Sequence, residues 1–241
     1  MVIGVLGGMG TAGSAVVAEL EQRGHAVRVL SRRTGFDATV PDRVAEVLGG
    51  VDVIIDCLQP SKTDGKSSRA LLVDGVRATL GVAEAAGVGH YVCLSIVGID
   101  RFSIPYYRAK VEQERAVLDG PVPGSIVRAT QFPELLDRVW EATRRFGVIP
   151  APRGVAAPIT PAEAAVVLVD AAESMPGAQP RREVRGRETI ELGSLAREWK
   201  RRHGSRRPVV PLPVLGGALK AIADGALVGG AARVPSGLPR G

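Results

Sequence analysis

The stretch that decides the fold is Val2-Ile3-Gly4-Val5-Leu6-Gly7-Gly8-Met9-Gly10-Thr11-Ala12-Gly13. Its apolar first half predicts a strand over 2–6, and a helical pattern begins at Thr11 and stops at Gly24. Residues 26–30 then predict a second strand. The order strand, glycine-rich turn, helix and strand within about thirty residues is typical of a βαβ unit, whose crossover is right-handed and whose strands are parallel.

The alternation of strands and helices continues along the chain. Apolar runs predict further strands at 51–58, 90–97 and 125–129, and helical patterns predict helices at 41–48, 69–86 and 104–118. This pattern predicts an α/β fold, a Rossmann-type doubly wound parallel sheet. Such a fold calls for another strand between Arg32 and Pro41, where residues 36–40 are the only candidate.

The alternation becomes less regular after Arg128. A helix is predicted over 134–146, and several prolines then interrupt the chain. Thr160-Pro161-Ala162-Glu163 is a capping box that opens a helix over 164–172, since the threonine hydroxyl and the glutamate can satisfy free amides at the helix start. A last apolar helix is predicted over 215–228.

The composition suits this fold. The chain has 241 residues, of which 45% are hydrophobic, and only nine are aromatic, so the core is built mainly from Val, Leu, Ile and Ala. We expect a Rossmann domain over residues 1–130. A small C-terminal lobe over 131–229, with elements that return to the first domain, and a loose tail over 230–241 are expected to follow.

Several signals are absent from the sequence. No apolar run reaches the length of about eighteen residues that spans a bilayer, and residues 1–6 lack the basic flank of a secretory signal. Cys57 and Cys93 lie in apolar runs, which favours buried thiols over disulfides. The three histidines are isolated, so we expect no metal site. These observations predict a cytoplasmic protein that does not bind membranes.

The net charge of +6 is concentrated in one segment. Residues 181–207 contain nine Arg and one Lys against four Glu, whereas the rest of the chain is neutral. The segment carries a single aromatic residue, Trp199, and no recognised nucleic-acid motif. A solvated helix face is therefore favoured, nucleic-acid binding is not expected, and contact with an acidic partner is the alternative.

The glycine turn predicts a phosphate site. Gly7, Gly10 and Gly13 form G-x-x-G-x-x-G between the first strand and the first helix, with Gly8, Met9, Thr11 and Ala12 as the intervening residues. Side chains at the glycine positions would hold the backbone away from a pyrophosphate, whose charge is met by free amides and by the positive end of the helix dipole. The position within a βαβ unit predicts a dinucleotide cofactor.

The end of the second strand indicates which dinucleotide binds. A carboxylate commonly binds the ribose 2′-hydroxyl of NAD there, but this chain has Ser31-Arg32-Arg33. Two guanidiniums and a hydroxyl can bind a 2′-phosphate, so NADP(H) is predicted in preference to NAD(H). The alternative is that Arg32 and Arg33 are solvated charges at a strand end.

A second motif supplies candidate reacting groups. Tyr106 and Lys110 have the spacing Y-x-x-x-K within a predicted helix, which places both side chains on one face, one turn apart. A neighbouring ammonium favours the phenolate, so Tyr106 is a candidate for proton exchange with a carbonyl or alcohol, and Lys110 can also reach a nicotinamide ribose. Ser95, at the end of a predicted strand, can donate a hydrogen bond to the same substrate oxygen or satisfy local backbone instead.

These motifs, together with Leu94-Ser95-Ile96-Val97-Gly98 and Val127-Arg128-Ala129-Thr130-Gln131-Phe132, resemble the NmrA-like branch of the atypical short-chain dehydrogenase/reductase superfamily. The resemblance runs from Val2 to about Glu191 and implies an NAD(P)-binding domain whose substrate cleft is closed by a C-terminal lobe. It implies that the nicotinamide is flanked by Thr130, Gln131 and Phe132, and that Cys57, Leu58 and Gln59 pass over the cofactor. By the same similarity, the substrate side would be lined by Phe132, Leu136, Trp140 and Phe146.

The chain contains no Asn, so the asparagine of the main family's proton relay is missing. Members of the atypical branch either reduce substrates or only bind the nucleotide and report its redox state. Two hypotheses follow. The first is an NADPH-dependent oxidoreductase that acts on a small molecule of carbonyl, quinone or imine type. The second is a non-catalytic NADP(H) sensor that acts through an acidic protein or nucleic acid.

Overall fold

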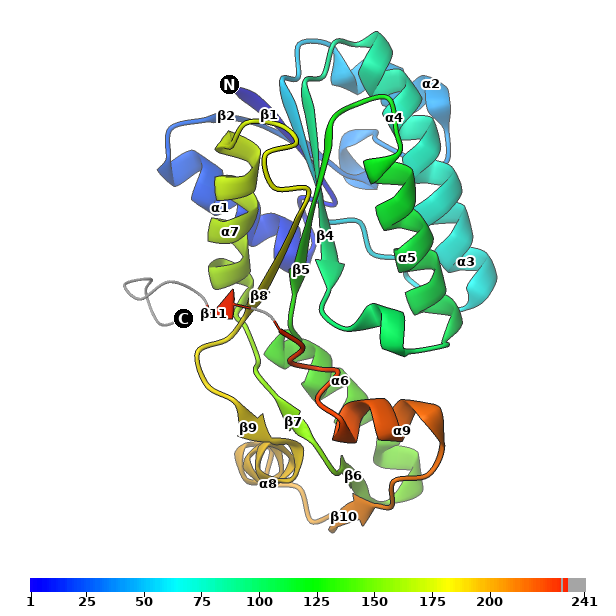
Figure 1. Ribbon diagram of the computed structural model, residues 1–241, viewed down its shortest axis with the longest axis vertical. Coiled ribbons are helices and arrows are strands. Elements are labelled where there is room, and N and C mark those ends of the chain that lie inside the picture. Colours follow the sequence, from blue (N-terminus) through cyan, green and yellow to red (C-terminus); the bar gives the residue numbers. More distant parts are fainter. Residues whose placement is uncertain (231, 234–241) are drawn as a thin grey trace.

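A parallel sheet of seven strands forms the centre of the protein, in the order β11-β8-β5-β4-β3-β1-β2 (Figure 1). The computed structural model describes residues 1–230 and the backbone of residues 232 and 233, apart from the side chains at positions 41 and 43. Every pairing between neighbouring strands is parallel, so the predicted fold class is confirmed. The strands are β1 (Val2–Leu6), β2 (Ala26–Leu30), β3 (Val53–Asp56), β4 (His90–Ile96), β5 (Gly124–Ala129), β8 (Arg181–Arg185) and β11 (Ala232–Arg233).

Helices cover both faces of the sheet. One face carries α1 (Thr11–Gln22) and α7 (Pro161–Glu173), and the other carries α2 (Pro41–Leu48), α3 (Gly65–Arg69), α4 (Val76–Ala85) and α5 (Pro105–Leu118). A π-helical turn, Ala70–Gly75, joins α3 to α4. Ile3 and Val5 of β1 are buried among α1 and α7, whereas Leu6 is buried in the core of the opposite face. Burial on both sides explains why the strands read as continuous apolar runs.

The strand expected at residues 36–40 does not form. Gly35 has a φ of 90°, which turns the chain after β2, and residues 36–40 form a loop with a turn at Ala38 and Thr39. Phe36 and Ala38 are nevertheless buried in the core, so the loop shows the alternation of a strand without joining the sheet. The loop packs closely against the helical layer, since a Cβ added at Gly75 would lie 3.1 Å from the Ala38 oxygen. β2 is therefore the edge strand.

A second group of elements, which we call the C-terminal lobe, lies at the bottom of Figure 1. Its own small core centres on Trp140 and Trp199, whose ring centroids are 6.0 Å apart. The predicted helix 134–146 is α6 up to Ala142 and then tightens to a 3₁₀ turn. The elements of the lobe are α6 (Pro133–Ala142), β6 (Ile149–Pro152), β7 (Val155–Ala156), β9 (Ile190–Glu191), α8 (Leu192–Arg202), β10 (Val209–Leu212) and α9 (Gly216–Ala223).

The chain returns from this lobe to the sheet. The capping box at Thr160 is confirmed, because its hydroxyl accepts from the Glu163 amide while Glu163 accepts from the Thr160 amide. The helix that it opens, α7, leads into β8. α7 is held against α1 by Arg23, whose guanidinium lies 2.8 Å from carboxylate oxygens of both Asp170 and Glu173.

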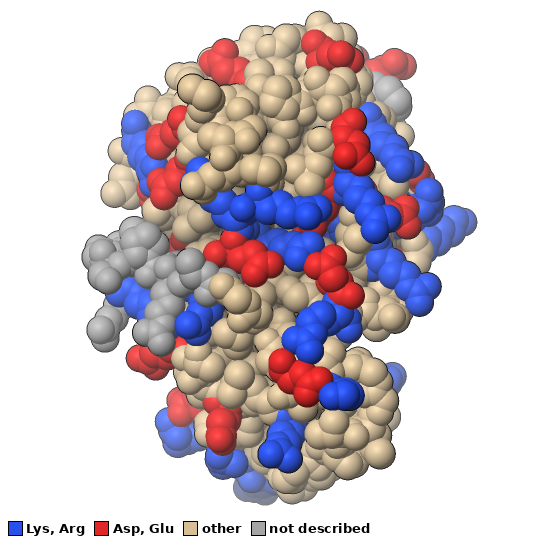
Figure 2. Space-filling model, in the orientation of Figure 1, with Lys and Arg blue, Asp and Glu red and all other residues tan. Residues whose placement is uncertain are grey.

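The basic segment 181–207 is not a single helix face. It begins with β8 inside the central sheet and continues through β9 and α8 to Arg207. On α8, Arg202 lies 3.8 Å from Glu198 and 3.7 Å from Asp137. Figure 2 shows acidic and basic side chains interleaved on one face of the molecule. The segment's excess charge is thus divided between the sheet and the C-terminal lobe.

Two further expectations concern the C-terminus. The last predicted helix, 215–228, is shorter than expected, since α9 ends at Ala223 and Gly225 turns the chain with a φ of 79°. The tail predicted for 230–241 lies mostly outside the described residues, but the backbone of 232 and 233 forms β11 on β8. Within the part of the chain that the structure describes, no helix is both long enough and apolar enough to cross a membrane.

Candidate nucleotide-binding and active site

The glycine turn brings bare backbone to the start of α1. Gly7 has a φ of 70°, and a Cβ added there would lie 2.9 Å from the Cys57 oxygen. A Cβ added at Gly13 would lie only 2.2 Å from the Gly7 oxygen, so the helix can approach the turn only without a side chain. Gly10 is the N-cap residue and no side chain caps it, which leaves amides at the positive end of the helix open to an anion.

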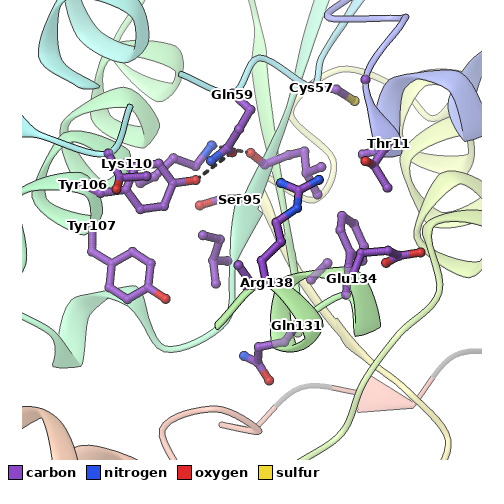
Figure 3. Close-up of a pocket in the computed structure, with 18 of the residues that line it drawn as sticks. Thr11, Cys57, Gln59, Ser95, Tyr106, Tyr107, Lys110, Gln131, Glu134 and Arg138 are labelled. Atoms are coloured by element: carbon purple, nitrogen blue, oxygen red, sulfur yellow. Dashed lines mark hydrogen bonds between the residues drawn. The ribbon is translucent and has the colours of Figure 1, made fainter. Parts of the chain in front are cut away.

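A cavity of about 590 Å³ lies at the carboxyl ends of the central strands (Figure 3). Ligands of doubly wound sheets bind at this edge. The cavity brings together residues from the glycine turn, from the loop after β3, and from the ends of β4 and β5 with α5 and α6. The predicted site residues that line it are Gly10, Thr11, Ala12, Cys57, Leu58, Gln59, Ser95, Tyr106, Lys110, Thr130, Gln131 and Phe132.

Tyr106 and Lys110 face this cavity from α5. The Tyr106 hydroxyl donates to Gln59 Oε1 at 2.8 Å, so Gln59 covers the candidate reacting group. Lys110 is only 4% exposed, and its Nζ donates to the Leu94 carbonyl at 2.7 Å and to Gln113 Oε1 at 2.7 Å. Two of its three donor hydrogens are thus used within the protein, which fixes the ammonium beside the cavity.

A buried polar chain lies behind Lys110. The Gln113 amide nitrogen donates to Asp56 at 2.8 Å, and Asp56 also accepts from the Tyr91 hydroxyl and from the Leu58 amide. Burial raises the pKa of Asp56, although Lys110 and these hydrogen bonds oppose the shift. Burial alone would lower the pKa of Lys110, but its acidic neighbours, Asp56 among them, outweigh this effect and raise the pKa. Lys110 is therefore an ammonium at neutral pH.

Sequence reasoning missed this chain of residues. Tyr106, Lys110, Gln113 and Glu114 follow the spacing i, i+4, i+7 and i+8, which places all four on one face of α5. All four are buried. Polar residues that share the helix face of a candidate catalytic pair were the signal that could have revealed them.

Ser95 reaches the cavity wall, but its hydroxyl is already engaged. It is 1% exposed, and its Oγ donates to Glu114 Oε1 at 2.5 Å. Arg128 holds the same carboxylate through two hydrogen bonds of 2.8 and 2.6 Å. Ser95 could donate a hydrogen bond to the expected substrate oxygen only after its hydrogen bond to Glu114 is broken.

A second pocket, of about 280 Å³, lies beside the end of β2. Ser31 and Arg32 line it, and Ser31 Oγ lies 3.2 Å from the sulfur of Met9, which joins this strand end to the glycine turn. Arg33, the next residue in the chain, is exposed. Within residues 1–230, neither arginine has a hydrogen bond or an ion pair with another side chain.

This pocket also contains a carboxylate that the sequence did not place there. Asp37 lines the pocket, and Thr39 donates to it through both its amide and its hydroxyl. These hydrogen bonds, with a contribution from Arg32, lower the pKa of Asp37. The end of β2 lacks a carboxylate, as predicted, but the following loop brings one to the same pocket.

The prediction for the substrate side needs correction. Phe132 lines the cavity, but Leu136 and Trp140 pack into the core of the C-terminal lobe, and Phe146 is 62% exposed on the 3₁₀ turn. α6 is apolar on two neighbouring faces. The face that lines the cavity carries the residues one position before those we expected, Leu135 in place of Leu136 and Val139 in place of Trp140. The residues of α6 that line the cavity are Glu134, Leu135, Arg138 and Val139.

Thr130 and Gln131, the two residues that follow β5, differ in their hydrogen bonding. Thr130 donates to the Ala157 carbonyl at 2.5 Å, so it holds the chain that returns to the sheet. Gln131 is 5% exposed, and neither its amide nitrogen nor its amide oxygen has a hydrogen-bond partner among the described residues. An unpaired buried amide costs about 1–3 kcal/mol, a cost that a ligand in the cavity can remove.

Comparison with known proteins agrees with this reading of the N-terminal half. Residues 3–101 match the model of the NAD dependent epimerase/dehydratase family. Photosystem II assembly factor Ycf39 of Trieres chinensis is 27% identical over an alignment of 143 residues, and the match covers 53% of this chain and 45% of that protein. The match therefore spans less than half the length of this curated relative.

Solved structures share the whole fold. A short-chain dehydrogenase/reductase superfamily protein from Agrobacterium tumefaciens with bound NAD has a TM-score of 0.69 at 18% identity, over 88% of this chain and 85% of that chain. The triphenylmethane reductase of Citrobacter sp., complexed with NADP(H), has a TM-score of 0.66 at 17% identity, over 95% and 92%. The UDP-glucose 4-epimerase of Thermotoga maritima has a TM-score of 0.71 at 14% identity, over 91% and 88%.

These likenesses define the class of fold. The protein has a Rossmann-type fold, and these solved structures share it. The comparisons reach reductases and epimerases alike and do not single out the NmrA-like branch, and the structures include both NAD and NADP(H) complexes.

Proposed function

We propose that the protein is an NADPH-dependent oxidoreductase of the atypical, NmrA-like type, which reduces a small carbonyl-, quinone- or imine-type substrate. One observation carries the proposal: the uncapped start of α1 and the Tyr106–Lys110 pair border the same cavity. A dinucleotide bound along this edge would have its phosphates at one group and its reactive ring at the other. The two free cysteines fit a reducing compartment, and we place the protein in the cytoplasm.

The residues that would hold the dinucleotide occupy two connected places. The amides of Thr11 and Ala12 would bind the pyrophosphate, since the Gly10 amide already donates to the Gly7 carbonyl. The second pocket would take the adenosine. Arg32 and Arg33 would bind the 2′-phosphate, which supports NADP(H) over NAD(H). The fit is supported by Gly13, since a Cβ there would collide with the Gly7 and Gly8 backbone and force the turn away from the helix start.

When bound, the nicotinamide supplies the hydride. Lys110 would bind its ribose with the one donor that Leu94 and Gln113 leave free. The buried amide of Gln131 would gain its missing partner from the ligand. Both roles use donors or acceptors that the protein itself does not satisfy.

Tyr106 would handle the proton. Its hydroxyl donates to Gln59 in the structure, so a substrate oxygen or nitrogen must replace Gln59 as the acceptor. The phenol hydrogen then moves to that substrate atom, and the Lys110 ammonium, fixed on the same helix face, stabilises the phenolate that remains.

The proposal is tested by titrating the protein with NADPH and NADH, followed by cofactor fluorescence. Binding of NADPH at least about tenfold tighter than NADH is expected from a charge-assisted phosphate contact. NADPH oxidation is then measured with carbonyl, quinone and imine panels. Tyr106→Phe should keep NADPH affinity and lose turnover by about 10²–10⁴-fold. A protein that binds neither nucleotide would refute the proposal.

One observation favours a second function. Ser95 is committed to Glu114 and Tyr106 to Gln59, so both candidate reacting hydroxyls are occupied within the protein. Hydroxyls that are already bonded within the protein are expected in a non-catalytic NADP(H) sensor. Such a sensor would bind an acidic protein or nucleic acid through residues 181–207. The name of Ycf39, to which this chain is similar, describes an assembly factor and not an enzyme. A partner whose affinity differs between NADP⁺ and NADPH, with no substrate-dependent NADPH oxidation, would establish the sensor.

A further inference from the structure

The cavity contains one cation without a partner. Arg138 of α6 lines the cavity and points into it (Figure 3), and it forms no hydrogen bond or ion pair with any residue in the described part of the chain. Lys110, the other cation of the lining, already donates to Leu94 and Gln113. The guanidinium of Arg138 is thus the charge that remains available to a ligand.

The nearest candidate to neutralise Arg138 does not do so. Glu134 is four residues earlier on α6, a spacing at which Glu and Arg commonly pair. No ion pair joins them in the structure, and Figure 3 shows the two side chains directed to different sides of the cavity. Glu134 lies in the first turn of α6, where the helix dipole already favours a negative charge.

The walls around Arg138 are apolar. Ile104, Leu135 and Val139 line the cavity and remain 41–48% exposed, although large aliphatic side chains seldom stay open to water together. Tyr107 adds an aromatic ring to the same wall. A ligand that covers these side chains must be apolar over most of its surface.

We propose that the cavity takes an apolar, ring-sized substrate that carries one anionic oxygen group, and that Arg138 binds this group. The inference rests on the proposed function, because it assigns the substrate class of the same site. A planar guanidinium binds carboxylate and phosphate oxygens through paired hydrogen bonds. Arg138 then sets orientation, since the apolar walls alone would accept the substrate either way round.

The phosphates of the dinucleotide are also anionic oxygen groups, and they could bind Arg138 in place of the substrate. If Arg138 served them, its loss would weaken NADPH binding and leave the substrate unaffected. If it binds the substrate, its loss would leave NADPH binding intact. Cofactor titration of the variant therefore separates the two sources.

The experiment uses the full chain saturated with NADP⁺ and two probes of equal shape, 2-naphthoate and its neutral counterpart 2-naphthamide. Calorimetric titration should give at least about tenfold tighter binding of the naphthoate, the size expected for one charge-assisted pair. Arg138→Met should remove this preference, and Arg138→Lys should keep part of it. Arg144→Met, on the exposed 3₁₀ turn outside the cavity lining, is the matched control and should change neither affinity.

Three results would overturn the inference. These are equal affinity for the two probes, no binding of the naphthoate to the NADP⁺-loaded protein, and loss of NADPH affinity in Arg138→Met with the probe preference unchanged. Each of them leaves the proposed function standing, because NADPH still binds to the wild-type chain. A chain that binds no NADP(H) would refute the proposed function, and this inference with it.

Discussion

Lys110 and Gln113 form a buried pair on α5, with the lysine Nζ 2.7 Å from the glutamine Oε1. The glutamine amide nitrogen donates onward to Asp56 at 2.8 Å. The Gln113 side chain therefore accepts a hydrogen bond from the Lys110 ammonium through its oxygen and donates one to the Asp56 carboxylate through its nitrogen. Gln113 does not line the cavity, and we infer from its bond to Nζ that it positions Lys110.

Gln113→Leu should leave Lys110 and Asp56 each short of a partner. We expect unfolding free energy to fall by about 1–3 kcal/mol and NADPH affinity to fall several-fold, because the ammonium loses its fixed position. Urea unfolding and NADPH titration measure the two effects, and the pH profile of turnover should change as well. A stability loss with unchanged NADPH affinity and an unchanged pH profile would reduce Gln113 to a purely structural residue.

Ser95→Ala should affect stability more than turnover. The hydroxyl donates to Glu114, which keeps both hydrogen bonds from Arg128, so we expect a loss of about 1 kcal/mol in unfolding free energy and less than tenfold in turnover. Ser125→Ala is the matched control, a buried strand serine bonded to His90 and absent from the cavity lining. A turnover loss as large as that of Tyr106→Phe would instead show that Ser95 acts on the substrate.

Gly13→Ala should damage the nucleotide site. The new methyl group would lie 2.2 Å from the Gly7 oxygen, so the turn must shift, at a cost of about 1–3 kcal/mol in stability, and NADPH binding should weaken more than tenfold. The control is Gly81→Ala in α4, where nothing lies within 4 Å of the added methyl group and where alanine should stabilise the helix by about 0.5–1 kcal/mol. Unchanged NADPH affinity in Gly13→Ala would contradict a phosphate site at this turn.

Arg32→Ala and Arg33→Ala should each weaken NADPH binding and leave NADH binding nearly unchanged. The preference should also shrink with added salt, since both side chains are exposed. Asp37→Asn should strengthen NADPH binding, because it removes a negative charge from the same pocket. Arg77→Ala, on the exposed side of α4, is the control. NADH binding that falls in parallel with NADPH binding would exclude a 2′-phosphate contact.

Stability should fall in acid partly through Glu173. The hydrogen bond to His25, with those from Arg23, lowers the pKa of this carboxyl in the folded chain. A lowered pKa stabilises the fold above the ordinary glutamate pKa of about 4.3, and the contribution disappears as the pH falls through the folded value. Glu173→Gln should therefore show a weaker loss of stability below pH 4.3 than the wild type, measured by urea unfolding at several pH values. Glu84→Gln, on an exposed helix face, should not differ from the wild type.

The central sheet could be predicted from the sequence because its strands are buried on both faces. Runs such as residues 53–55 are apolar throughout, and glycines and prolines separate them from the helices. The loop at 36–40 could not be distinguished from a strand, since Phe36 and Ala38 alternate inwards as strand residues do. The turn at Gly35 and the packing of Ala38 against Gly75, a contact between distant parts of the chain, distinguish the loop from a strand.

The site was predictable where one motif carries it and not where packing selects a helix face. The glycine turn and the Tyr106–Lys110 spacing are local signals, and both border the cavity. On α6, the pair Leu135 and Val139 and the pair Leu136 and Trp140 have the same i, i+4 spacing, so periodicity alone cannot say which pair meets the cavity. The partner that settles it, Trp199 of α8, is far along the chain.

The path of the chain also limits how the cavity can open. After β5 the chain enters the C-terminal lobe, returns for α7 and β8, leaves again, and comes back for β11. A lobe attached at four points cannot swing as it would on a single linker. We therefore expect ligand entry to depend on rotation of side chains that line the cavity, Arg138 among them, and not on a swing of the whole lobe.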